Sequence, residues 1–233
     1  MAKIALCVIA TNDYIGFVPD LLKSADKYFL IGHEVHYIIF TNRMETHETI
    51  ETTRYERWIN IDHEPWPMMT LKRYHIMSGA NLSGYDYVYY IDADMLFVAP
   101  VGDEIFGELV GVQHPGFYRG GGSWETRKES NAYVAPHERF TYIAGGFQGG
   151  WQYCTFAKYM AKMIDQDSEK GITAVHNDES HYNAVFSLFE QRFNLLSPSY
   201  CMVEEPEKRK AWGIDHLEPK IIALSKDHKK YQK

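Results

Sequence analysis

The chain has 233 residues and a mass of 27.1 kDa, and 45% of its residues are hydrophobic, which suffices for one sizeable globular domain. Its net charge of −7 at pH 7 argues against a general nucleic-acid-binding protein, because neutralising phosphates requires a basic surface. Three widely spaced cysteines without a Cys-x-x-Cys pair indicate neither a disulfide framework nor a zinc site, and they fit a reducing compartment.

The first part of the sequence alternates strand and helix patterns. Residues 4–10 form a short apolar run that predicts a buried strand rather than a secretory signal. A helical pattern follows, with Pro19 in its first turn and Gly32 beyond its end. Residues 35–40 predict the next strand, and this order is typical of a parallel, doubly wound sheet. No stretch approaches the ~20 apolar residues that span a bilayer, so we expect a soluble, cytoplasmic protein without signal peptide or membrane anchor.

Two carboxylates close a later strand. A polar stretch at residues 41–53, a short strand at 58–61 and a helix at about 70–82 come first, and the strand ending at Asp92 follows. Asp92 and Asp94 are two residues apart, so they can project to one side and bind one divalent cation. Ligands of open α/β sheets bind outside the carboxyl ends of the strands. Acidic residues also end strands as solvated turn formers, and the pair alone leaves both interpretations open.

The second half is rich in glycine. Glycines cluster at residues 111–122 and 145–150, either as turns and bulges between short strands or as backbone that lies close to a ligand. No Gly-x-Gly-x-x-Gly or Walker pattern occurs. Helices are predicted at residues 151–164 and from about Asp178, and strands at 193–196 and 221–224. The end of the chain, 225–233, is basic, with four lysines against one aspartate. The absence of a repeat or a low-complexity linker favours a single domain.

Acidic residues also begin the last long predicted helix. Asp178 and Glu179 precede Tyr182 by four and three residues, so both carboxylates lean toward the buried side of the helix. Capping of the helix is one interpretation. The other is catalytic, since a helix N-terminus favours an ionised carboxylate that can stabilise positive charge or act as a nucleophile. Together with a metal-bound diphosphate at Asp92 and Asp94, Glu179 would suit glycosyl transfer from a nucleotide sugar.

Four motifs in this order resemble those of family 6 glycosyltransferases, which include the histo-blood-group A and B transferases and the α1,3-galactosyltransferase. They span residues 91–95, 114–118, 142–150 and 178–181. The resemblance implies a GT-A type α/β fold, a mixed central sheet with helices on both faces. It implies one catalytic domain, with a nucleotide-binding half at 1–95 and a donor-sugar and acceptor half at 96–233. The chain is similar to short microbial members without the stem and membrane anchor.

The activity that the resemblance implies is retaining transfer of N-acetylgalactosamine or galactose from a UDP donor to a galactoside acceptor, fucosylated or not, in α1,3 linkage. Asp92 and Asp94 would bind Mn²⁺ or another divalent cation, and Glu179 would be the catalytic carboxylate. Residues expected to bind the donor are Ile9, Thr11, Tyr14, Arg73, Asp92, Ala93, Asp94, Ala144, Gly145, Gly146, Asp178 and Lys226. Residues expected to bind the acceptor are His114, Gly116 and His176.

Small residues favour the bulkier donor. In the family that the chain resembles, enzymes that take the N-acetyl group tend to keep small residues in the donor pocket. The matching residues here, Gly116, Ala144 and Gly146, are small, so we expect UDP-N-acetylgalactosamine rather than UDP-galactose. The retained aspartates predict dependence on a metal. The chain departs from the family where His176 and Asn177 replace Trp-His, and where residues 201–203 replace part of the acceptor site. A sugar-binding protein without turnover and a metal phosphohydrolase are the alternatives.

Overall fold

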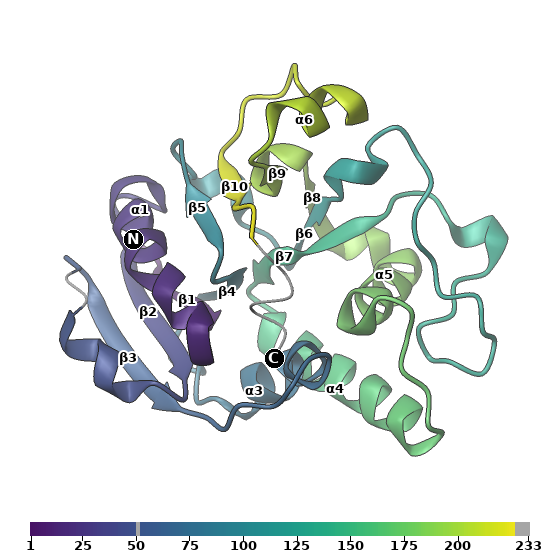
Figure 1. Ribbon diagram of the computed structural model, residues 1–233, viewed down its shortest axis with the longest axis horizontal. Helices are drawn as coiled ribbons and strands as arrows, with labels where there is room; N and C mark the ends of the chain where they lie inside the picture. The colour runs from purple at the N-terminus through teal and green to yellow at the C-terminus, as the bar shows by residue number, and fades with distance from the viewer. Residues whose placement is uncertain (50–51, 227–233) are drawn as a thin grey trace.

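A seven-stranded mixed sheet forms the centre of the computed structural model, which describes residues 1–49 and 52–226 (Figure 1). The strand order is β3-β2-β1-β4-β7-β6-β8. Strands β3, β2, β1 and β4 are parallel, whereas β7 runs antiparallel to both β4 and β6. The predicted mixed sheet is therefore confirmed: β6 and β8 pair in parallel as well, and β7 interrupts the otherwise parallel arrangement. The strands are β1 (Lys3–Ile9), β2 (Glu34–Thr41), β3 (Tyr55–Asn60), β4 (Tyr87–Asp92), β6 (Leu109–Gln113), β7 (Ile143–Gly150) and β8 (Phe193–Leu196).

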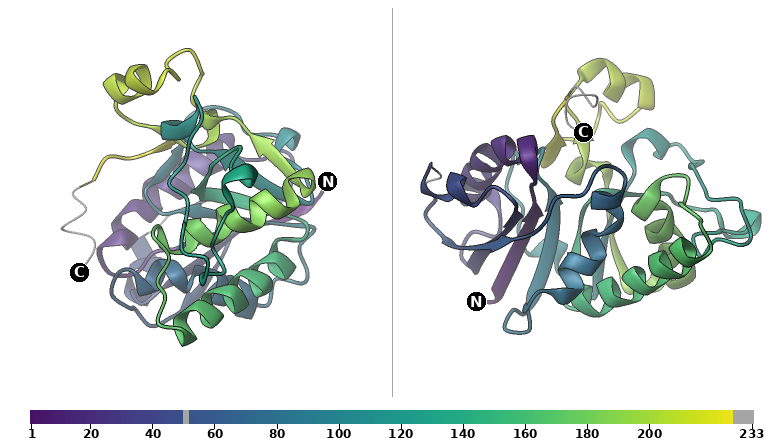
Figure 2. Two further views of the ribbon diagram at one scale, coloured as in Figure 1. Left: turned by 90° about the vertical axis from the view of Figure 1, so that its right-hand side faces the viewer. Right: turned by 60° about the horizontal axis from the view of Figure 1, so that its bottom comes forward.

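Helices cover both faces of this sheet, as predicted (Figure 2). Alternate residues of β1 enter two separate cores, with Leu6 in one and Cys7 in the other, which explains the continuous apolar run in the sequence. One core contains the buried residues of α1 (Val18–Tyr28). The opposite core contains those of α3 (Arg73–Gly79), α4 (Tyr153–Glu169) and α5 (Asn177–Phe189).

The single helix predicted at 70–82 is wrong in its extent. The structure has two short helices instead, α2 (Met68–Leu71) and α3, separated by Lys72 with a ψ of −7° that departs from helical geometry. The second helix ends at Gly79, the residue type with the lowest helix propensity apart from proline, and Ala80 is already extended. Residues 12–17, which had no predicted structure, form a 3₁₀ helix.

The glycines at 145–150 lie inside strand β7, and every residue of this strand is buried. These four glycines therefore do not form turns between short strands, whereas the alternative of a bulge is supported, because the register of β7 against β6 shifts between Val110 and Val112. A Cβ atom on Gly149 would lie 2.3 Å from Cδ1 of Tyr89 and 2.6 Å from the carbonyl oxygen of Val88, both in the neighbouring strand β4. Glycine at this position allows β7 to pack beneath the Tyr89 ring.

Replacing Gly149 by alanine is expected to lower the free energy of unfolding by about 1–3 kcal/mol, because the added methyl group overpacks a buried sheet. Urea denaturation followed by circular dichroism measures the effect. Gly84→Ala is the matched control, since no atom lies within 4 Å of the added Cβ at that position. Equal unfolding midpoints for the two variants would contradict this prediction, because they would show that β4 and β7 accommodate the methyl group without a loss of stability.

A second, three-stranded sheet contains the last strand of the described chain. Strand β10 (Ile221–Ala223) pairs antiparallel with β5 (Met95–Phe97) and parallel with β9 (Met202–Val203). Strands β8 and β10 confirm the two predicted late strands, whereas the helix α6 (Pro206–Trp212) has no sequence counterpart among our predictions. Within residues 1–49 and 52–226, no helix combines the length and apolar character that crossing a bilayer demands. Lys229, Lys230 and Lys233 of the predicted basic tail lie outside the described residues.

Candidate functional site

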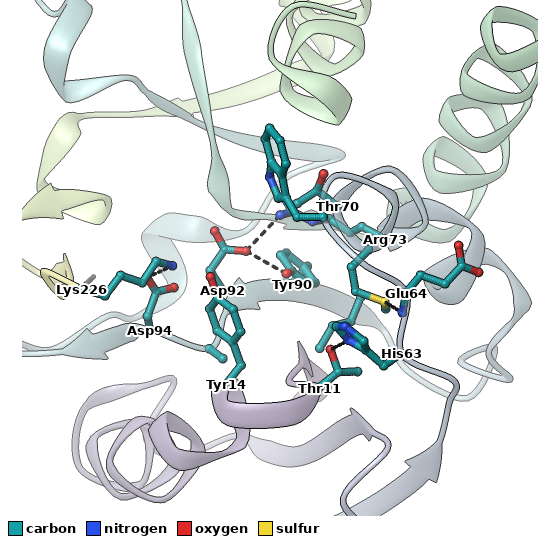
Figure 3. Close-up of a pocket in the computed structure, with 14 residues that line it drawn as sticks. Thr11, Tyr14, His63, Glu64, Thr70, Arg73, Tyr90, Asp92, Asp94 and Lys226 are labelled. Atoms are coloured by element: carbon teal, nitrogen blue, oxygen red, sulfur yellow. Dashed lines mark hydrogen bonds and ion pairs between the residues drawn. The ribbon is translucent and has the colours of Figure 1, made fainter. Parts of the chain in front are cut away.

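A cavity of about 240 Å³ opens at the carboxyl ends of β1 and β4. The sequence rule for ligand sites in α/β sheets predicts this edge. Figure 3 shows that side chains from distant parts of the sequence converge here, among them Arg73, Asp92 and Lys226. Eight of the residues predicted to bind the donor line the cavity: Ile9, Thr11, Tyr14, Arg73, Asp92, Ala93, Asp94 and Lys226. The structure therefore brings these residues together, while their individual roles stay predictions.

Arg73 connects four elements at the edge of this cavity. Its side chain is 9% exposed, and the guanidinium carbon lies 4.3 Å from the centroid of the Tyr90 ring. Nη2 donates to Oδ1 of Asp92 at 3.0 Å, and Nη1 donates to the carbonyl of Gly145 at 2.7 Å. Nη1 also lies 3.3 Å from Oδ2 of Asp178. One cation thus positions β4, β7 and α5 relative to α3.

Asp92 presents one carboxylate oxygen to the open space beside β7. The alternation of β4 places it on the same side as Tyr90, whose hydroxyl donates to Oδ1 at 2.7 Å. Arg73 donates to the same oxygen. The other oxygen, Oδ2, lies 3.3 Å from the point that a Cβ on Gly146 would occupy. The glycine therefore keeps the space beside Oδ2 open.

The two aspartates fit a divalent cation that is bound together with a diphosphate. Oxygen ligands suit Mg²⁺ and Mn²⁺, and one or two carboxylates with substrate phosphates and water are a common ligand set for such ions. Asp92 and Asp94 supply two carboxylates at the cavity. Among the described residues, no group of three or more histidine, cysteine, aspartate or glutamate side chains could hold a metal. The two carboxylates would supply part of a coordination sphere, and the ligand and solvent would supply the rest.

The carboxylates that begin α5 face the sheet edge, as predicted. Asp178 is buried against Arg73, and Oε2 of Glu179 accepts the backbone N–H of Gly145 at 3.0 Å. The N-cap residue, His176, makes no side-chain cap, and Asn177 after it has a left-handed φ of +49°. The contacts with Arg73 and Gly145 favour a role in the site over the capping interpretation.

Burial makes these carboxyl groups hold a proton more tightly than their place at a helix N-terminus alone would suggest. It raises the pKa of Asp178 to about 6, although Arg73 lowers it in part. Burial also raises the pKa of Glu179 and of Asp92, against the opposing effects of the Gly145 N–H and of Arg73 respectively. The expectation that the helix N-terminus favours the ionised form is therefore wrong in sign, because desolvation exceeds it. Asp178 is still mostly ionised at pH 7.

The predicted acceptor residues flank Glu179. His114 packs against the ring of Tyr142 with centroids 5.7 Å apart, and the Tyr142 hydroxyl interacts with Glu179. Nδ1 of His114 accepts the N–H of Gly116 at 3.0 Å, and burial lowers the pKa of His114 to about 4, so its ring is neutral at pH 7. His176 is exposed, and its Nε2 contacts Oγ of Ser123. Ala144 is buried in β7. None of the four predicted residues, His114, Gly116, His176 and Ala144, lines the cavity that contains Asp92 and Asp94.

Sequence reasoning missed six residues that line the cavity. Nδ1 of His63 lies 2.9 Å from Oγ1 of Thr11, and Trp66 is half-exposed at the cavity rim. Most of the missed residues follow the carboxyl end of β3, at the same sheet edge as Asp92, so the edge rule could have found them. The six are His63, Glu64, Trp66, Met69, Thr70 and Tyr90.

Comparison with known proteins gives matches over almost the entire chain. The sequence model described as glycosyltransferase family 6 matches residues 1–232. Histo-blood group ABO system transferase 1 of Rattus norvegicus is 32% identical over 97% of this chain and 67% of its own length. Globoside alpha-1,3-N-acetylgalactosaminyltransferase 1 of Canis lupus familiaris is 34% identical over 84% of this chain and 60% of its own length. Alpha-1,3-galactosyltransferase 2 of Homo sapiens is 24% identical over 85% and 62%. This chain thus spans about 60 to 67% of the length of these three relatives.

Proposed function

This chain belongs to glycosyltransferase family 6, and we propose that it transfers N-acetylgalactosamine from UDP-N-acetylgalactosamine to a galactoside in α1,3 linkage, with retention at the anomeric carbon. As a glycosyltransferase it uses a sugar donor and a glycan acceptor, and the cavity at Asp92 and Asp94 offers a place for the donor. The α1,3 linkage is supported by the names of the globoside transferase and the human galactosyltransferase.

The observation that carries the proposal is the arrangement around Arg73. This residue joins Asp92, on the cavity side, to Asp178 beside Glu179. Asp92 and Asp94 would hold a divalent cation on the donor diphosphate, where it would act as a Lewis acid on the leaving group. Glu179 would stabilise the positive charge that develops at the anomeric carbon, and its N–H contact from Gly145 fixes its orientation.

The remaining contacts with the donor follow the shape of the cavity. Ile9, Thr11 and Tyr14 line it at the end of β1, where we place the uracil ring. Asp178 would accept hydrogen bonds from hydroxyl groups of the donor sugar. Its pKa of about 6 keeps it an acceptor at neutral pH. His114 and Gly116, with His176 at the rim, would contact the acceptor galactoside.

Preference for the N-acetyl donor is supported by the space at Gly146. A Cβ at this position would lie 3.1 Å from Sδ of Met95 and 3.6 Å from Sγ of Cys201, so a larger side chain would fill this part of the site. The relative that is named for N-acetylgalactosamine is 34% identical, and the one named for galactose is 24% identical. UDP-galactose is the second candidate donor, since pocket shape alone discriminates sugars only modestly.

A donor screen tests the proposal. The protein is incubated with UDP-N-acetylgalactosamine or UDP-galactose, with Mn²⁺ or EDTA, and with a fucosylated or plain galactoside. We expect a higher kcat/KM for the N-acetyl donor, an α1,3 product by NMR, and loss of transfer in EDTA. UDP release that does not depend on the acceptor would identify a phosphohydrolase. Donor binding without transfer or UDP release would identify a binding protein.

A further inference from the structure

The ammonium group of Lys226 binds a carboxylate that the proposed metal needs. Its Nζ lies 2.5 Å from Oδ2 of Asp94, and the two side chains are 14% and 10% exposed. The same ammonium lies 4.6 Å from the centroid of the Tyr14 ring (Figure 3). Asp94 is therefore paired with a cation of the protein itself.

The small sheet holds this lysine in place. Ala223 pairs with Met95, the residue after Asp94, and the N–H of Leu224 donates to the carbonyl of Asp94 at 2.8 Å. Lys226 follows two residues later, so its backbone is anchored next to the carboxylate that it binds. The contact joins residues 132 positions apart in the sequence and depends on β10 rather than on a local turn.

The charges of the site leave room for one divalent cation. Four carboxylates, Asp92, Asp94, Asp178 and Glu179, stand against two cations, Arg73 and Lys226, which leaves a charge of −2 when all are ionised. Arg73 forms ion pairs with Asp92 and Asp178. Within the described part of the chain, Lys226 provides the one ion pair of Asp94.

We propose that Lys226 is an internal counter-ion of the metal site, bound to Asp94 in the ligand-free protein and displaced from it when a divalent cation binds. The inference rests on the metal-binding role of Asp94 in the proposed function. An ammonium and a metal ion that share one carboxylate oxygen compete for it, so Lys226 weakens metal binding to the protein alone. A diphosphate offers the displaced ammonium a new anionic partner. Metal and nucleotide therefore bind cooperatively through Lys226.

Binding of Mn²⁺ without nucleotide tests this directly, with free Mn²⁺ measured by EPR. We expect Lys226→Met to lower the Kd for Mn²⁺ by about 5- to 150-fold, the usual range of coupling between two sites. Lys226→Arg keeps the positive charge and should bind Mn²⁺ like the wild type. The enhancement of Mn²⁺ affinity by UDP should shrink in Lys226→Met, because the displaced cation is missing.

Lys220→Met is the matched control, because Lys220 pairs with Glu104 and does not line the cavity. It removes the same net charge and should leave the Kd for Mn²⁺ unchanged. An equal or weaker Mn²⁺ affinity in Lys226→Met would overturn the inference, as would equal tightening in Lys220→Met. These outcomes are independent of the donor screen. If the wild type transfers sugar and Lys226→Met binds Mn²⁺ with unaltered affinity, the counter-ion role of Lys226 is refuted and the proposed function stands.

Discussion

Replacing Glu179 by glutamine is expected to lower kcat for sugar transfer by about 10²- to 10³-fold, the usual cost of losing one electrostatic stabiliser of a transition state. The substitution is nearly isosteric. The amide oxygen can still accept the N–H of Gly145, which Oε2 of Glu179 accepts at 3.0 Å in the wild type. The variant therefore keeps the position of the side chain and loses its negative charge.

The affinity for UDP separates a catalytic role of Glu179 from a structural one. UDP and the metal would bind on the cavity side, at Asp92 and Asp94, so the Kd for UDP measured by calorimetry should stay near that of the wild type. Glu190→Gln, at an exposed position just beyond the end of α5, serves as the control and should leave kcat unchanged. If UDP affinity falls as much as transfer, Glu179 supports the structure of the helix start instead.

Sequence patterns predicted the parts of this fold that depend on local periodicity. The apolar runs of β1 and β4 are buried on both faces of the sheet, and a strand in that position reads as a continuous run of hydrophobic residues. The rule that ligands bind at the carboxyl edge then placed Asp92 at the site. Strand β7 was missed because four of its eight residues are glycines, which have low strand propensity and are used here for close packing.

Sequence periodicity could not predict long-range contacts or the burial of polar side chains. Arg73 meets Gly145 across 72 positions of sequence, and Lys226 meets Asp94 across 132. Contacts over such separations in sequence produce no periodic pattern. The motif resemblance therefore identified these residues but not the contacts between them. The pKa of Asp178 was misjudged for a related reason. The helix start can be predicted from the sequence, whereas the burial of the Asp178 carboxylate against Arg73 depends on segments that are distant in the sequence.

Replacing Arg73 by methionine is expected to lower the free energy of unfolding by about 3–5 kcal/mol at pH 8, since removing one partner of a buried ion pair leaves an uncompensated charge. Asp178 would lose its cation, and Asp92 would keep only the Tyr90 hydroxyl on Oδ1. Urea denaturation measures the loss. Arg43→Met, which breaks an exposed pair with Glu45, should leave the stability unchanged within error.

The loss of stability in Arg73→Met should depend on pH in a direction set by Asp178. Its pKa is about 6 in the folded protein and about 4 in an unfolded chain, so the protonated form stabilises the fold below pH 4, and this contribution disappears as pH rises through 6. Without Arg73, which lowers this pKa, the carboxyl group binds its proton still more tightly. At pH 5 the group is then neutral in the variant, and we expect a clearly smaller loss than at pH 8.

A second substitution isolates the charge of Asp178. In Arg73→Met/Asp178→Asn, the unpaired carboxylate is absent, so at pH 8 the double variant should be more stable than Arg73→Met alone. Losses that simply add, with no dependence on pH, would mean that Arg73 stabilises the protein through packing on Tyr90, whose ring lies 4.3 Å from its guanidinium. A partial recovery would instead assign the stability to the ion pair that joins α3 to the start of α5, where Glu179 is held.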